Sequence, residues 1–124
     1  MGYRSEVVFA VGKELAPFFT AMLAKSPEAE RLCRDADQYE SGYEEEGDFF
    51  MYWNHIKWYE SYPEIQVIEQ FIAELDEAAE EFFPGVDDVH SRWRFVRIGE
   101  DYDDVEDKGG GFWDTVNIQR AINF

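Results

Sequence analysis

The segment DFFMYWNHIKWYESYPEIQVIEQFIAEL, residues 48–75, contains a strand pattern followed directly by a helix pattern. Over residues 48–59, apolar and aromatic side chains occupy both sets of alternating positions, which is typical of a strand covered on both faces. Ser61 and Glu64 then have the spacing of a capping box, and Pro63 fits the first turn of a helix. The apolar face of this helix recurs at steps of three and four: Ile65, Ile68, Ile72, Leu75, Ala79 and Phe82.

Further strands and helices are predicted on both sides of this junction. Residues 3–11 and 92–98 have strand patterns with apolar side chains on both faces. Residues 15–23 have helical spacing, and a serine followed by a proline begins a second helical piece over residues 26–34. Residues 38–43 predict a short strand, which leads to an exposed hairpin end at the three glutamates Glu44, Glu45 and Glu46.

The C-terminal residues 112–124 alternate as a half-buried strand would, and we expect this strand to pair with residues 92–98 across an acidic loop. Its inward positions are Phe112, Val116, Ile118, Ile122 and Phe124. The predicted order is β-α-β-β-α-β-β in one acidic domain, residues 1–124. This order favours an α+β fold, a two-layer sandwich with an antiparallel sheet and two helices on one face, in a ferredoxin-like order.

The net charge of −17 is distributed unevenly along the chain. Residues 1–36 carry five basic and five acidic residues, whereas residues 37–124 carry six basic and twenty-three acidic residues. Such a charge repels nucleic acid and anionic membranes and attracts basic protein surfaces or cations. Solubility is the alternative explanation, but 45% hydrophobic and 18% aromatic residues exclude a disordered acidic tail.

The single cysteine, Cys33, has no partner for an internal disulfide and fits a reducing compartment. The first fifteen residues contain no apolar signal region, and no stretch approaches eighteen consecutive apolar residues. We therefore expect a soluble, intracellular protein without a membrane partner.

Ten acidic residues form the leading candidate binding surface. The predicted helix over residues 61–83 carries no Lys or Arg, and the carboxylates of its last turn oppose the helix dipole, which suggests that the acidity has a use. A second acidic group follows the strand at 92–98. The predicted binding residues are Glu69, Glu74, Asp76, Glu77, Glu80, Glu81, Glu100, Asp101, Asp103 and Asp104.

No complete catalytic, metal-binding or cofactor-binding set is present in the sequence. The acidic run at 100–107 lacks the central glycine of a calcium-binding EF-hand loop and is better explained as a solvated loop. The segment KGGG at 108–111 lacks the spacing of a P-loop. His55 and His90 provide no short-spaced ligand pair for zinc, even with Cys33. The sequence therefore predicts no catalytic residue, no metal and no cofactor, which favours a role other than catalysis.

The arginines at 92, 94 and 97 alternate with aromatic residues, as in some single-strand-binding proteins. In a chain with this net charge we expect them to pair with nearby acids, and we expect no direct binding of nucleic acid.

An alternative hypothesis is a small enzyme or ligand-binding domain built on an aromatic patch, namely His55, Trp58, Tyr59 and Tyr62. A pocket that contains His55 beside a carboxylate would support it, and a fully packed His55 would exclude it. A third hypothesis is a self-associating module, and the sequence leaves the oligomeric state open.

Three segments and the spacing among them carry a resemblance to known proteins: MGYRSEV at 1–7, HIKWYESYPEIQ at 55–66 and FVRIGEDYDDVE at 95–106. They resemble a group of small, mostly uncharacterised proteins encoded in tailed-bacteriophage genomes. The resemblance implies a phage origin, expression in the host bacterial cytoplasm and a host-directed accessory role. The resemblance assigns no catalytic residue to this sequence.

Taken together, the charge and the resemblance favour a non-catalytic phage accessory protein that binds and modulates a host protein with a basic surface. DNA mimicry and inhibition of a defence complex are two forms of this hypothesis. Mimicry would require the two acidic groups to share one surface, because helix positions three or four apart lie roughly 5–6 Å from each other and could then approximate the spacing of phosphates.

Overall fold

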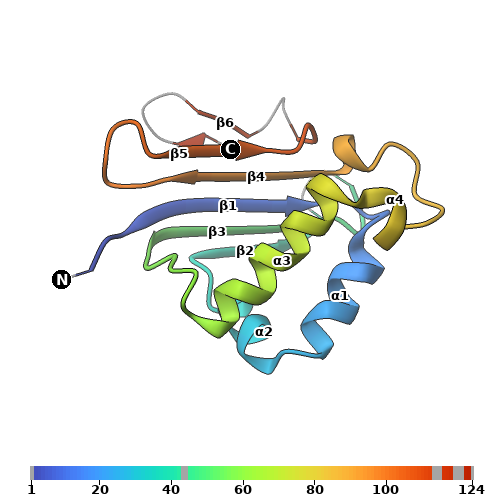
Figure 1. Cartoon of the computed structure of the whole chain (residues 1–124), viewed down its shortest axis with the longest axis horizontal. Helices are drawn as coiled ribbons and strands as arrows, with labels where there is room; N and C mark the ends of the chain where they lie inside the picture. The colour runs from blue at the N-terminus through green and yellow to red at the C-terminus, as the bar shows by residue number, and fades with distance from the viewer. Residues whose placement is uncertain (1, 43–44, 113–115, 119–121, 124) are drawn as a thin grey trace.

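The computed structural model describes residues 2–42, 45–112, 116–118 and 122–123. It contains a five-stranded antiparallel sheet with helices on one face (Figure 1). In spatial order the strands are β2 (Gln38–Ser41), β3 (Phe49–Ile56), β1 (Ser5–Val11), β4 (Trp93–Ile98) and β5 (Val105–Lys108). The first strand of the chain therefore lies at the centre, between strands that come from much later in the sequence.

The main core lies between the sheet and the helices, and it is rich in aromatic side chains. Phe9 at the centre of β1 contacts the rings of Phe19, Phe71 and Phe95 at centroid distances of 5.8, 6.4 and 6.1 Å. All three pairs are edge-to-face, the arrangement that the charge distribution of aromatic rings favours. These rings come from β1, α1, α3 and β4, so this cluster joins the sheet to the helical layer.

The opposite face of the sheet carries a second, smaller apolar cluster. Val8 and Ala10 of β1 pack there with Phe50, Val96 and Val116, and all five are fully buried. The predicted apolar character of both faces of β1 is confirmed. Burial of the second face requires Val116, from near the end of the chain, because the helices all lie on the other side.

Two helices connect β1 to β2: α1 (Ala16–Ala24) and α2 (Pro27–Arg34). The predicted cap between them is present, since Ala29 N–H donates a hydrogen bond to Ser26 Oγ at 3.3 Å. Ala29 and Cys33 provide the buried side of α2.

The second helical connection is α3 (Pro63–Glu77) followed by α4 (Ala79–Phe82). Pro63 lies in the first turn as predicted, but Tyr62 is the N-cap and no side chain caps the helix, so the capping role expected of Ser61 is wrong. The apolar face is buried as expected up to Leu75.

The predicted single helix breaks at Ala78, whose φ of −139° and ψ of 38° lie outside the helical region. The break changes the phase of the turn that follows. Phe83 is therefore buried, whereas Phe82, the expected last member of the apolar face, is 44% exposed.

The C-terminal part of the chain differs most from the prediction. A short 3₁₀ helix, Val89–Arg92, precedes β4, and the strand that pairs with β4 is β5, from within the expected acidic loop. The residues expected to form that strand instead contain two short strands, β6 (Asn117–Ile118) and β7 (Ile122–Asn123), which pair with each other. Phe124 and the side chains of residues 117–118 and 122–123 lie outside the described residues and atoms.

The glycines at 109–111 carry the chain from β5 across Trp93, at the start of β4. Gly111 N–H donates to the Trp93 carbonyl at 2.9 Å. A Cβ added at Gly111 would lie 2.8 Å from the Trp93 backbone nitrogen, which is too close for any other residue without a shift. These glycines therefore allow a close crossing toward the second face of the sheet, which Phe112 and Val116 then cover.

The predicted α+β class, with an antiparallel sheet and helices, is confirmed. The two helical connections contain more helices than the two expected, and Phe112 and Val116 pack on the second face of the sheet. Among the helices of the described residues, none is both long enough and apolar enough to span a bilayer.

Candidate functional site

The acidic residues of β5 are paired with the arginines of β4. Arg94 is bidentate to Asp107, with Nε to Oδ1 at 2.6 Å and Nη2 to Oδ2 at 2.9 Å. Arg97 bonds Asp104 Oδ1 at 2.6 Å and Glu106 Oε1 at 3.1 Å. Both arginine side chains are largely buried, with 10% and 12% of their surface exposed. The expectation that these arginines pair with acids is confirmed.

Asp104 is the best-coordinated carboxylate of this region. Besides Arg97, it accepts a hydrogen bond from the Tyr3 hydroxyl to Oδ2 at 2.6 Å. The Arg97 guanidinium, and then the Tyr3 hydroxyl, lower the pKa of Asp104 below its ordinary value because both stabilise the charged form. Asp104 therefore joins the N-terminal segment to β4, which is a structural role.

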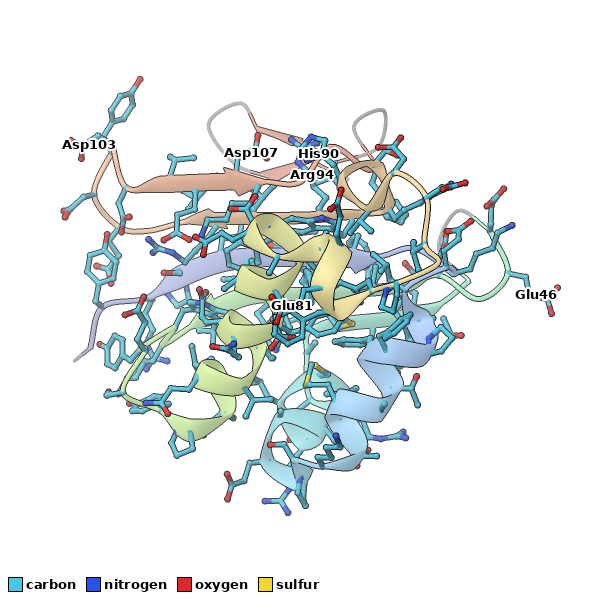
Figure 2. The ribbon with its side chains drawn as sticks, turned by 45° about the vertical axis from the view of Figure 1, so that its right-hand side comes forward. Glu46, Glu81, His90, Arg94, Asp103 and Asp107 are labelled. Atoms are coloured by element: carbon cyan, nitrogen blue, oxygen red, sulfur yellow. The ribbon has the colours of Figure 1, made fainter. Side chains whose placement is uncertain are left out.

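The other predicted residues of this loop divide into bonded and exposed members. Glu100 accepts a hydrogen bond from the Arg4 backbone N–H, and the Asp101 backbone N–H donates to the Tyr3 hydroxyl at 3.0 Å. Asp103 is exposed at the turn (Figure 2). Much of the expected acidic loop is thus part of the sheet or bonded to the chain near Tyr3.

The acids of α3 do not all lie on one face. Trp58 Nε1–H donates to Glu69 Oε1 at 2.8 Å, and Gln70 Nε2 donates to Glu74 Oε2 at 3.1 Å. Glu69 and Glu74 are five residues apart, so their side chains leave the helix about 140° apart. Glu74 faces a groove beside α1, and Glu69 lies on the other flank against Trp58.

Four carboxylates at the end of this helical region remain solvated. Within the described part of the chain they are exposed and form no ion pair: Asp76, Glu77, Glu80 and Glu81. Because the helix breaks at Ala78, Glu77 and Glu81 belong to different helices, and the regular spacing expected between them does not apply. Together with the exposed Asp101 and Asp103 of the loop, these four are the residues of the predicted surface that form neither an ion pair nor a side-chain hydrogen bond in the described part of the chain.

The two acidic groups lie at opposite ends of the sheet. Figure 1 shows α4 beside the end where β4 begins, and the turn from β4 to β5 at the other end. The six residues of β4 span about 20 Å. Figure 2 likewise shows Glu81 well separated from Asp103. The structure does not bring the helix acids and the residues at 100–103 onto one surface.

The aromatic patch divides between core and surface. Trp58 is buried and packs against Trp53 and Phe95, at centroid distances of 5.4 and 5.8 Å. Tyr59 contacts Tyr62 at 5.2 Å, and its hydroxyl accepts the Tyr3 N–H at 2.6 Å.

His55 is exposed, and it lines none of the three cavities described below. His90 is exposed in the 3₁₀ helix. The four patch residues therefore do not converge on a pocket.

A groove between α1 and α3, which the sequence did not predict, is one concavity of the described residues. Its volume is about 730 Å³, and α4 closes one end with Phe82 and Phe83. The sequence signal that could have indicated this groove lies in α1. Its sequence APFFTAMLA has no charged residue, so the helix carries more apolar surface than a single face against the sheet requires. Phe18 and Met22 are the half-buried side chains that provide this excess.

Two smaller cavities are weaker candidates for a functional site. One of about 360 Å³ includes Cys33, but burial, with a contribution from Glu30, raises the pKa of this thiol to about 12. Cys33 is therefore a thiol at neutral pH and not an activated nucleophile. The other, of about 110 Å³, is polar, and its Arg92 is paired with Glu14 at 3.3 Å.

Within the described residues, no three His, Cys, Asp or Glu side chains are placed to hold a metal ion. Comparison of the chain with protein-family models, with curated proteins and with solved structures finds no match.

Proposed function

We propose that this chain is a non-catalytic binding protein whose helical side attaches to a basic surface on a partner protein. The observation that carries the proposal is the contrast among its carboxylates. Those of β5 are neutralised by arginines, whereas Asp76, Glu77, Glu80 and Glu81 are exposed and pair with no cation of the described residues. Such a charge, concentrated and unpaired, steers and binds cationic surfaces and repels nucleic acid.

The resemblance to tailed-bacteriophage proteins extends this proposal. In that setting the protein acts in the host bacterial cytoplasm, and its partner is a host protein with a basic surface, such as nucleic-acid-binding or defence machinery. We favour recognition of a basic protein surface over mimicry of a regular duplex, because the break at Ala78 and the distance between the two acidic groups do not support phosphate-like spacing.

The test compares two double charge reversals that change the net charge equally. Glu77→Lys with Glu81→Lys alters the helical side, and Glu46→Lys with Asp103→Lys alters exposed sites at opposite edges of the molecule (Figure 2). Immobilised wild type and variants are exposed to nuclease-treated bacterial lysate at low and high salt. We expect a protein that is captured by the wild type and by the second variant, and that is lost with the first variant and at high salt.

If both double variants lose capture equally, general charge attraction rather than the helical side accounts for the binding. Capture that is unchanged by the first variant and indifferent to salt would refute it.

We also propose that the topology is a ferredoxin-like variant with β5 added at the edge. The adjacency β2-β3-β1-β4, with helical connections after β1 and β3, supports this proposal. NMR contacts between Phe9 of β1 and Phe95 of β4 test it, and their absence would contradict it.

A further inference from the structure

The groove between α1 and α3 presents an apolar floor with an acidic border. Its large apolar lining residues are Phe18, Met22, Val67, Phe71, Phe82 and Phe83. Phe82, at 44%, is one of three exposed large hydrophobic side chains among the described residues. An open apolar concavity of this size on a chain with a charge of −17 is typical of a binding surface.

The dimensions of the groove fit a helix. The α3 side of the groove extends from Pro63 to Glu74, with Gln66, Val67 and Gln70 between them. This spacing of three and four follows one flank of α3 over about 16 Å, or three turns. A docked amphipathic helix places its anchoring side chains at i, i+3 or i+4, and i+7, which is the span that such a groove accommodates.

The charges at the border of the groove determine which helix fits. Glu74 lines the groove, Glu77 lies one turn further along α3, and Glu80 and Glu81 precede Phe82. Lys25 is the single cation among the described lining residues. A second copy of this chain would bring the same carboxylates to the interface, and like charges facing each other weaken an interface. A segment with basic residues beside its apolar face is complementary.

We propose that the groove between α1 and α3 binds an amphipathic, basic helix of the partner protein, with the apolar side chains of that helix against Phe18, Val67 and Phe82. This inference rests on the proposed function and deepens it, because it adds an apolar anchor and a defined shape to charge attraction. The carboxylates speed association and select for basic sequences, and the groove selects for the helical spacing of apolar residues.

Two labelled peptides serve as probes. One is a Leu/Lys peptide of about 14 residues, four helical turns, with its leucines on one face. The other has the same composition in an order that spreads the leucines around the helix. The two peptides have equal charge, so salt-dependent binding of either one reports attraction to the acidic surface. Only the difference between their affinities reports binding in the groove. By fluorescence anisotropy we expect the first peptide to bind at least about tenfold more tightly.

Two matched substitutions locate the binding site. Ala21→Trp inserts a large ring from α1 into the groove, and Thr20→Trp inserts the same ring at the neighbouring exposed position, which does not line this groove. We expect Ala21→Trp to weaken binding of the ordered peptide about tenfold and Thr20→Trp to change it less than about twofold. Phe82→Ser, at an exposed position, provides a second groove variant, and circular dichroism confirms that each variant is folded.

The outcomes separate the two proposals. Equal, salt-sensitive binding of both peptides that Ala21→Trp and Phe82→Ser leave unchanged would overturn the groove inference and leave the proposed function intact. No binding of either peptide would overturn both. A wild-type dimer that Ala21→Trp converts to a monomer by light scattering would assign the groove to a second copy and overturn the inference.

Discussion

The acidic residues of β5 and those at the end of α3 are both dense in the sequence, but their carboxylates have different surroundings. In β5 the register places Glu106 opposite Arg97, and Asp107 opposite Val96, next to Arg94, so each carboxylate meets a guanidinium. In α3 and α4 no basic residue exists within the same segment, and the four carboxylates from Asp76 to Glu81 are exposed. A run of acidic residues therefore stabilises the fold where an adjacent strand supplies cations. Where no neighbouring segment supplies them, the carboxylates remain available for binding.

The largest effect on stability should come from removal of Arg97. Arg97→Met leaves Asp104 and Glu106 without their cation, and a hydrogen bond to a charged group in a largely buried site contributes on the order of 2 kcal/mol. We expect the free energy of unfolding in urea to fall by about that amount. The same substitution at Arg34, whose pair with Glu30 is exposed, is the control, with an expected loss of less than about 0.5 kcal/mol. Equal losses would show that burial does not distinguish the two pairs.

A smaller effect is expected when the charge is kept and the geometry is lost. Arg94→Lys retains a cation near Asp107 but cannot form the two parallel hydrogen bonds. We expect a loss of about 1 kcal/mol in the free energy of unfolding. A lysine variant as stable as the wild type would mean that charge alone accounts for the pairing.

Low pH should reduce the contribution of the same region to the free energy of unfolding. The lowered pKa of Asp104 means that its stabilising contribution is present above the carboxyl pKa of the unfolded chain, about 3.9, and is lost as the pH falls through the lower value in the folded state. Wild type should therefore exceed Asp104→Asn in stability at pH 5, and the difference should shrink as the pH falls below about 4. Urea titrations across this range test the sign. A constant difference would contradict it.

The smallest effect on stability is expected at the end of α3. Glu77→Lys with Glu81→Lys removes two exposed carboxylates and places cations near helix C-termini, where they interact favourably with the dipole. The free energy of unfolding should change by less than about 0.5 kcal/mol, measured by thermal and urea denaturation. A loss above about 1 kcal/mol would show that these acids have structural partners after all.

Much of the fold could be predicted because local patterns agree with their tertiary setting. The two apolar faces of β1 and β4, the cap at Ser26 and the apolar side of α3 up to Leu75 all follow from spacing alone. The break at Ala78 could not be predicted, since alanine and glutamate both favour helix and the segment contains neither Gly nor Pro. Its consequence is that Phe82, expected in the core, became part of the groove.

The edge strand β5 was missed for a different reason. The sequence VEDK has little strand propensity and resembles a loop, and its pairing depends on Arg94 and Arg97 in β4. The range 112–124, by contrast, has the stronger strand pattern, but the place beside β4 is occupied by β5, and Asn117–Ile118 pairs with Ile122–Asn123 instead. The acidic candidate site could be predicted from composition. Its division into two separate groups could be recognised only once the topology was known.

The central position of β1 has a consequence for how the protein is made. Residues 5–11 are synthesised before both of their neighbouring strands, and they obtain the second neighbour only when residues 93–98 have been added. At about 5–20 residues per second, this interval lasts on the order of 10 s on the ribosome. Throughout that time the nascent chain carries a strand that is apolar on both faces and unpaired along at least one edge. The pairing of the central strand therefore depends on contacts that are distant in the sequence, and such contacts form more slowly than local ones.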